Sequence, residues 1–271
     1  MARLSSMSQA DRGARFAALH EGEPFVIPNP WDAGSARVLE ALGFPALTTT
    51  SSGFAFTLGR LDGGATLDEL VAHVEALAGA VDVPLAVDLE DGPGPEPEDV
   101  ADAIRRVANA GAVGASIEDW DPREQRLHDR GRAAERIAAA AEAAGSLGYP
   151  FVLVGRAENH IRGNPDLDDT IARLQAYEAA GADCLYAPGP RTLEEIGAVC
   201  AAVTKPVNVL AVPGLTAQEI FDAGAQRISV GGALTWVAAR ALADAAVALR
   251  DGDLSPLAAR IPLGDWLRAA D

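Results

Sequence analysis

The sequence predicts a single α/β domain, a closed (β/α)8 TIM barrel. Short β-branched or apolar runs recur along the chain, and an amphipathic helical stretch follows each run. Several of these stretches end in glycine just before the next run, as in "NAGAVGAS" and "DAGAQRIS". The length of 271 residues suits one barrel, which commonly needs about 250 residues. The predicted strands are residues 25–29, 46–51, 84–89, 114–119, 151–156, 184–188, 207–211 and 227–231.

The strongest helix signals lie at residues 66–81 and 97–111, where apolar residues recur at helical spacing. Thr66 and Glu69 form a capping-box pattern, and Pro97 is typical of a first helical turn. A doubly wound open sheet is the competing topology. The first strand, however, is not followed by the glycine-rich phosphate fingerprint of that fold.

The segment after the eighth strand is longer than a barrel unit requires. Residues 231–252 read as one long helix, and residues 255–271 as a further helical segment. We therefore expect one domain over residues 1–271, whose C-terminal helices (232–271) pack on a neighbouring subunit.

Composition excludes several classes of function. A net charge of −17 argues against a nucleic-acid partner, because phosphate binding needs a basic face. No apolar run reaches a membrane span, and residues 1–16 lack the apolar core of a signal peptide, so we expect a cytoplasmic protein. Cys184 and Cys200 lack metal-type spacing and predict reduced thiols. The lone lysine, Lys205, stands at a strand entrance, which disfavours Schiff-base chemistry.

Three acidic residues stand where two neighbouring predicted strands end. In a barrel, such strand exits converge on one mouth. Strand alternation would point Asp88 and Glu90 to the same side, and Glu118 follows the next strand. Three converging carboxylates predict a hard divalent cation, Mg²⁺ or Mn²⁺, because repulsion and burial would otherwise raise their pKa values. The alternative is that these acids cap turns or pair with arginines.

Further polar residues follow the other strands. Arg156 leaves a very apolar strand and could clamp a carboxylate, or could pair with one of the acids. Ser51, Ser52 and Gly53 offer amides for an anion. Glu158, His160 and Asn208 also lie at or near strand ends, and His160 is a candidate for proton transfer or an ordinary loop residue.

The sequence motifs at these strand ends together resemble those of the isocitrate lyase/phosphoenolpyruvate mutase superfamily. The resemblance rests on "PNPWDAGSAR", "TTSSG", "VDLEDGPG", "SIEDW" and "VGRAEN", which follow one another in order between about residues 25 and 245. It implies a barrel whose last helix is swapped between subunits of a homodimer or homotetramer. It also implies Mg²⁺, a 2-oxo acid or related carboxylate substrate, and cleavage of a C–C or P–C bond through a metal-stabilised enolate.

The resemblance also assigns residues. Asp88 matches the principal metal aspartate, Glu90 the second acid of that motif, and Glu118 the acid of "IED". Ser51, Ser52 and Gly53 match the segment that holds the substrate carboxylate, and Arg156 matches the substrate arginine. Asp62 matches an acid bordering the site, and Trp31 and Asp32 match an aromatic–Asp pair. The general acid or base stays open among Glu158, His160 and Asp62.

One loop departs from the superfamily. Residues 120–132, "WDPREQRLHDRGR", carry neither the "K-[KR]-C-G-H" motif of the isocitrate-type lyases nor the "P-K-x-N" segment of the phosphonate-cleaving members. We therefore expect a lyase or hydrolase that cleaves a C–C bond in a small 2-oxo acid or 2-oxo/hydroxy dicarboxylate, such as an oxaloacetate- or methylisocitrate-like compound. The alternatives are P–C chemistry with Arg123 or Arg126 on the phosphate, a hydroxymethyl transferase, or a non-catalytic 2-oxo acid binder.

Overall fold

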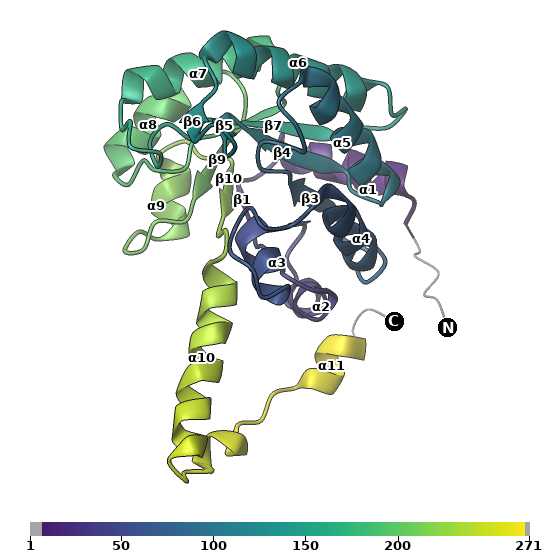
Figure 1. Cartoon of the computed structure of the whole chain (residues 1–271), viewed down its shortest axis with the longest axis vertical. Helices are drawn as coiled ribbons and strands as arrows, with labels where there is room; N and C mark the ends of the chain where they lie inside the picture. The colour runs from purple at the N-terminus through teal and green to yellow at the C-terminus, as the bar shows by residue number, and fades with distance from the viewer. Residues whose placement is uncertain (1–6, 269–271) are drawn as a thin grey trace.

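The computed structural model describes residues 7–268 and has a parallel barrel at its centre (Figure 1). Its eight strands are ordered β1-β10-β9-β8-β7-β4-β3-β2. The amide of Thr48 donates to the carbonyl of Pro28 (3.2 Å), which joins the two edges. The barrel strands are β1 Phe25–Ile27, β2 Leu47–Thr48, β3 Leu85–Asp88, β4 Gly114–Glu118, β7 Val152–Arg156, β8 Cys184–Tyr186, β9 Val207–Leu210 and β10 Arg227–Ser229.

The helices lie outside this sheet. They are α1 Gln9–Leu19, α2 Ala33–Ala41, α3 Ser51–Thr57, α4 Leu67–Ala78, α5 Pro97–Asn109, α6 Arg130–Gly145, α7 Leu167–Ala179, α8 Leu193–Ala201, α9 Ala217–Asp222, α10 Ala233–Arg250 and α11 Leu263–Arg268, with a short 3-10 helix η1 at Ser255–Ala258. Within residues 7–268, no helix is both long and apolar enough to cross a membrane.

Local sequence signals account for the element boundaries. Thr66 caps α4 in the expected capping box, with its amide donating to Glu69 Oε2 (2.9 Å). Pro97 opens α5. The eight-stranded parallel barrel predicted from the sequence is confirmed, and each predicted strand is present in a shorter form.

Two boundaries differ in ways that matter for the site. The second strand was expected to run to residue 51, but it ends at Thr48 and Ser51 begins α3, capped by the Thr50 hydroxyl. The third strand ends at Asp88, and Glu90 has a left-handed backbone (φ 51°). Strand alternation therefore does not apply to Glu90, and a turn positions this residue instead.

Two further elements were not predicted. Helix α1 precedes the first strand, and its Phe16 is fully buried among residues near strand starts, including Phe25, Val113 and Val152. This helix therefore closes the amino-terminal end of the barrel. A small antiparallel hairpin, β5 (Trp120–Asp121) and β6 (Arg126–Leu127), follows β4.

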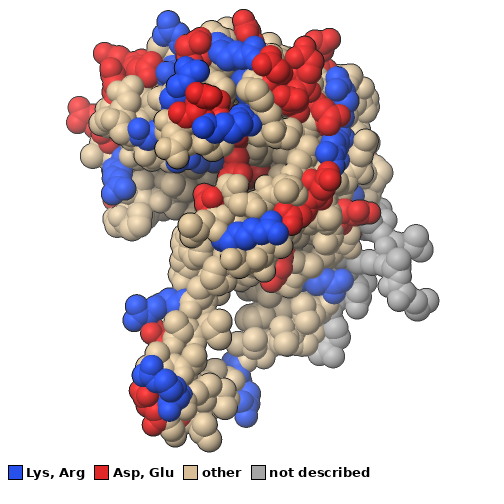
Figure 2. All heavy atoms as spheres, viewed as in Figure 1, with Lys and Arg blue, Asp and Glu red and all other residues tan. Residues whose placement is uncertain are grey.

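The long helix predicted after the eighth strand is confirmed as α10, which projects from the barrel as an arm (Figure 1). On the visible face, the shaft of this arm carries few charged side chains compared with the barrel helices (Figure 2). The chain then returns, and α11 contacts α2, where Arg37 Nη1 donates to the carbonyl of Leu267 (3.0 Å). Residues 269–271, part of the predicted C-terminal segment, lie outside the described residues.

Candidate active site

A cluster of carboxylates surrounds Arg156 at the carboxyl ends of the strands. Arg156 Nη1 lies 3.2 Å from Glu118 Oε2 and 3.4 Å from Asp88 Oδ1, while its Nε donates to Glu158 Oε1 at 2.6 Å. Its guanidinium also lies over the ring of Tyr186, 5.2 Å from the ring centre. Arg156 therefore pairs with the acids at the mouth, which was the alternative from the sequence, and its role as a clamp for a substrate carboxylate stays a prediction.

Asp88 is held by several weak contacts. Its carboxylate accepts from the amides of Ser51 (3.4 Å) and Glu90 (3.3 Å) and from the Ser116 hydroxyl (3.4 Å). With the Arg156 contact at 3.4 Å, all four are longer than the 2.7–2.9 Å typical of charge-assisted hydrogen bonds. The carboxylate is thus well positioned but retains capacity to bind a further positive group.

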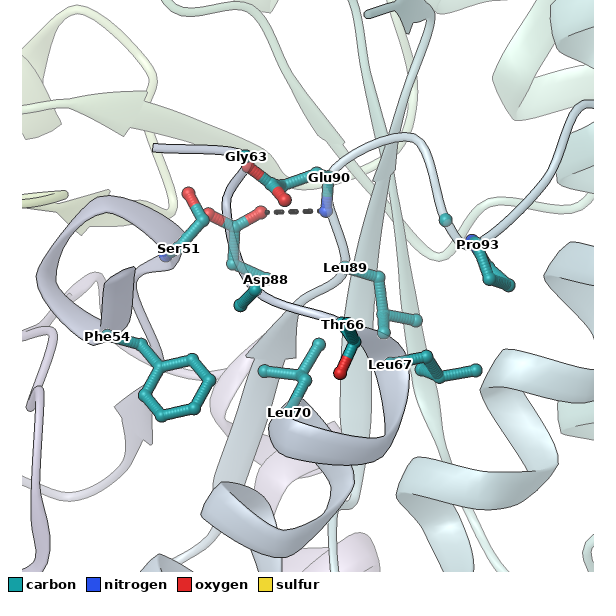
Figure 3. A pocket seen from close by; sticks show the side chains of 12 residues that line it. Ser51, Phe54, Gly63, Thr66, Leu67, Leu70, Asp88, Leu89, Glu90 and Pro93 are labelled. Carbon is teal, nitrogen blue, oxygen red and sulfur yellow. Dashed lines mark hydrogen bonds between the residues drawn. The ribbon is translucent and has the colours of Figure 1, made fainter. Parts of the chain in front are cut away.

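Glu90 lies beside Asp88 (Figure 3), and its pKa is raised to about 8. The first cause is burial, followed by the negative charges of Asp88 and Asp62. Phe54, Leu70 and Leu89 contribute apolar walls to the adjoining pocket. Asp62 itself is exposed at the rim of the site, and its side chain hydrogen-bonds to Glu90.

Glu118 is almost fully buried at the end of β4, and its pKa is raised well above the usual value. Desolvation is the main cause; Arg156 opposes it, whereas Glu158, Asp88 and Glu90 add to it. Its second oxygen lies 3.6 Å from Arg162 Nη2. The structure therefore brings the three predicted metal residues, Asp88, Glu90 and Glu118, into one electrostatic cluster.

Glu158 is fully buried between two arginines. One carboxylate oxygen accepts from Arg156 Nε and the other from Arg162 Nε (2.9 Å), while its amide donates to Asp119 Oδ1. Both oxygens are thus occupied by cations, an arrangement suited to orienting arginines rather than to exchanging a proton. Arg162 also lies over the Trp120 ring, 4.7 Å from its centre. No motif of the sequence singles out Arg162.

A central cavity of about 170 Å³ opens beside this cluster. Asp88, Arg156 and Asn208 are among the residues that line it. The Asn208 amide nitrogen donates to the Ser229 hydroxyl at 2.9 Å. The cavity also contains Asp62, Ser51 and Ser52 in its lining, so most of the predicted substrate residues share one space.

The Ser51–Gly53 segment forms the start of α3. The Ser51 amide donates to Asp88, and the Gly53 amide donates to the Thr50 hydroxyl (3.3 Å). Gly53 does not line the cavity; a methyl group there would lie 2.5 Å from Thr50 Cγ2 and 2.6 Å from Thr235 Oγ1. Glycine is therefore required here for packing.

We expect Gly53→Ala to lower the free energy of unfolding by about 1–3 kcal/mol, because the added methyl group overpacks the start of α3. Urea unfolding followed by circular dichroism measures this change. Gly145→Ala is the control, since a methyl group at Gly145 meets no atom within 4 Å. Equal stability of the two variants would contradict the steric role of Gly53.

The lining of this cavity also excludes Trp31, Asp32 and His160. Asp32 caps α2, where its Oδ1 accepts from the Ser35 amide at 2.7 Å. Trp31 lies beside Gly53. His160 packs against Gly189, and its Nε2 is buried without a hydrogen-bond partner within the described residues.

Ion pairs hold the loop after β4 in place. Arg123 contacts the carboxylate of Asp91 and donates from Nε to Asp121 Oδ1 (3.0 Å). Burial raises the pKa of Asp91 to about 6, despite Arg123 and Arg136. Arg123 therefore serves as a partner of these acids and lines one hollow with Glu90 and Glu118, whereas Arg126 lines a different hollow, beside Asp121 and Asp129.

The oxygen atoms of the carboxylate cluster fit a cation that is bound mainly through Asp88. Within residues 7–268, no three His, Cys, Asp or Glu side chains are arranged to enclose an ion by themselves. The cluster nevertheless holds four carboxylates, those of Asp88, Glu90, Glu118 and Glu158, against two arginines, Arg156 and Arg162. Burial and then the neighbouring carboxylates raise the pKa values of Glu90 and Glu118, so a bound cation would stabilise their charged forms. A Mg²⁺ ion commonly uses one or two carboxylates and retains water.

Comparison with known proteins identifies the family. A family model for phosphoenolpyruvate phosphomutase matches residues 16–250. The chain belongs to this family, within the isocitrate lyase/PEP mutase superfamily. The resemblance inferred from the strand exits is thereby confirmed.

Three similar proteins indicate which class of reaction to consider. An oxaloacetate decarboxylase of Rhodopseudomonas palustris is 33% identical over 257 residues, covering 91% of this chain and 87% of that protein. A Burkholderia cenocepacia protein provisionally assigned as a lyase/mutase is 46% identical, with a TM-score of 0.93 and coverage of 97% and 98%. An oxaloacetate acetylhydrolase bound to oxalate is 26% identical, with a TM-score of 0.85 and coverage of 94% and 93%. These relatives support a carbon–carbon lyase.

Proposed function

We propose that this chain is a Mg²⁺-dependent enzyme (Mn²⁺ being the alternative ion) that cleaves a C–C bond in oxaloacetate or a closely related dicarboxylate. The observation that carries the proposal is the cluster of Asp88, Glu90 and Glu118 around Arg156, beside a small cavity at the strand exits. The similarity to oxaloacetate-directed relatives supports this choice of substrate.

Each residue has a defined task in this proposal. Asp88 would hold the ion directly, and Glu90 and Glu118 would hold it through water. When bound, the ion supplies Lewis acidity toward the 2-oxo group. Arg156, held in place by Glu158, orients the substrate carboxylate and adds positive charge where negative charge develops. Asp62, at the rim, is the candidate for proton transfer because it is exposed and contacts Glu90.

The experiment measures products from oxaloacetate with added Mg²⁺ and with a chelator, after subtraction of the non-enzymatic reaction. Pyruvate indicates decarboxylation, whereas oxalate and acetate indicate hydrolysis. We expect chelator-sensitive turnover to one of these product sets. Absence of turnover of oxaloacetate, methylisocitrate and dimethylmalate would contradict the proposal.

The P–C alternative is less favoured. It needs a free basic group for the phosphate, but Arg123 is paired with Asp91 and Asp121, and Arg126 faces another hollow. Phosphonopyruvate belongs in the same substrate panel, and its turnover would reverse this preference.

We also propose that the C-terminal arm is an interface between subunits. Along it, Val237 and Leu242 are 67% and 68% exposed, and Leu254 and Leu257 are also exposed. Such a row of exposed apolar side chains is typical of an interaction surface. A homodimer or homotetramer would bury it. A cytoplasmic location, consistent with the free thiols of Cys184 and Cys200, stays a prediction from the sequence.

We expect Leu242→Glu to shift the protein to a smaller assembly in light scattering, because each buried leucine contributes about 1.5–3 kcal/mol to an interface. Leu193→Glu, at another partly exposed leucine away from the arm, is the control and should leave the molar mass unchanged. A monomeric wild-type protein would contradict the proposed interface.

A further inference from the structure

Arg227 is a buried arginine that lacks an acidic partner. Its exposed fraction is 4%, and no carboxylate of residues 7–268 forms an ion pair with it. The comparably buried Arg136 and Arg173 both contact an aspartate, Asp91 and Asp119 respectively. A buried charge without a counter-charge is costly, so an anion that binds near Arg227 would gain an unusually large electrostatic stabilisation.

The side chains that contact the Arg227 guanidinium are uncharged. Its Nε donates to Asn208 Oδ1 (2.8 Å), and its Nη1 lies 3.1 Å from His20 Nε2. Burial and the charge of Arg227 lower the pKa of His20 to about 3, so the imidazole is uncharged at neutral pH. His20 Nδ1 lies 2.8 Å from the carbonyl of Phe16, which fits a tautomer that accepts a hydrogen bond from Arg227. Neither residue cancels the positive charge.

The strand register connects Arg227 to the candidate active site. Arg156 pairs with Tyr186, Tyr186 with Asn208, and Asn208 with Arg227 across β7, β8, β9 and β10. All four residues line the same central cavity. These four residues form a polar row across the barrel wall. Because Arg156 is the last residue of β7 and Arg227 the first residue of β10, the polar row runs from the mouth of the barrel toward its interior. Three strand steps of roughly 4.8 Å separate its ends.

We propose that Arg227, with Asn208 and Ser229, forms a second anion subsite that binds the distal carboxylate of a dianionic substrate. The proposal deepens the proposed function, because it defines the substrate class as dicarboxylates. Arg156 and Arg227 both line the cavity of about 170 Å³, whose size suits a small molecule, and two arginines on one cavity wall favour a ligand with two anionic groups. Arg227 is thereby a specificity-determining residue.

The test uses two stable probes of equal size. Malate carries two carboxylates, and 2-hydroxy-4-methylpentanoate carries an isopropyl group in place of the second. Calorimetry in Mg²⁺ buffer measures their affinities for the wild-type protein, Arg227→Gln and Arg227→Lys. Arg105→Gln, at an exposed arginine, is the matched control. Circular dichroism and the unliganded Tm establish that each variant is folded.

We expect the wild-type protein to prefer malate at least tenfold. Arg227→Gln should lose this preference while retaining its weak affinity for the isopropyl probe, and Arg227→Lys should keep part of it. Equal affinities of the wild-type protein for the two probes would overturn the proposal without any variant. An unchanged preference in a folded Arg227→Gln protein would also overturn it.

These outcomes are separable from the proposed function, because neither probe has to react. If the preference for malate depends on Arg227 but oxaloacetate is not cleaved, the anion subsite is supported and the proposed reaction is contradicted. If oxaloacetate is cleaved but the preference for malate does not depend on Arg227, the proposed reaction is supported and the anion subsite is contradicted.

Discussion

Asp88→Asn should lower kcat/KM for oxaloacetate by roughly a thousandfold or more. The substitution preserves the shape of the side chain but removes the charge that would bind the cation, and metal Lewis acidity contributes several kcal/mol to catalysis. The Ser51, Glu90 and Ser116 contacts to this side chain are long and weak, so we expect little change in the folded structure. Steady-state kinetics over a range of Mg²⁺ concentrations measures the effect.

Asp102→Asn is the matched control, since Asp102 is exposed on α5 and lies outside the cavity lining. It should have wild-type kinetics. An Asp88→Asn enzyme with wild-type activity and unchanged Mg²⁺ dependence would remove Asp88 from the proposed mechanism.

Arg156→Gln should reduce both activity and stability. The guanidinium is the shared partner of Asp88, Glu118 and Glu158, and its loss leaves Asp88 without this cation and Glu118 and Glu158 with Arg162 alone. Breaking a buried ion pair in this way costs about 3–5 kcal/mol. We expect a fall of at least about a hundredfold in kcat/KM, because a group that stabilises developing charge is lost, together with a lower midpoint in urea unfolding.

Arg156→Lys separates the two effects. Lysine retains the charge but cannot bridge the carboxylates with a planar fork, so stability should recover more than activity. Arg105→Gln should change neither. A fully stable, fully active Arg156→Gln protein would show that the cluster does not need this cation.

The barrel could be predicted because each of its strands is a short apolar run and several of its helices begin at a capping residue or end just before a glycine. The site could be predicted in outline for the same reason: Asp88, Glu118 and Arg156 each occupy a strand end, and parallel strands in a barrel bring their ends together. Glu90 also reaches the cluster, but through a left-handed turn that alternation does not describe.

Other assignments depended on tertiary structure. Asp32 matched a superfamily position, yet its carboxylate caps α2 through Ser35, a role that its position before a helix also allowed. Arg162 lies in a loop without strong sequence signals, and only folding places it against Glu158 and Trp120. That no carboxylate of the described residues 7–268 forms an ion pair with Arg227 is a property of the packed interior and has no counterpart in the local sequence.

The central claim is that the carboxylate cluster around Asp88 binds one divalent cation at the barrel mouth. Titration of the full chain with Mn²⁺, followed by electron paramagnetic resonance of the free ion, tests it most directly. The wild-type protein should bind one Mn²⁺ per chain, competed by Mg²⁺, and Asp88→Asn should bind at least tenfold more weakly. Absence of Mn²⁺ binding by the wild-type protein, or equal binding by the folded Asp88→Asn protein, would contradict the claim.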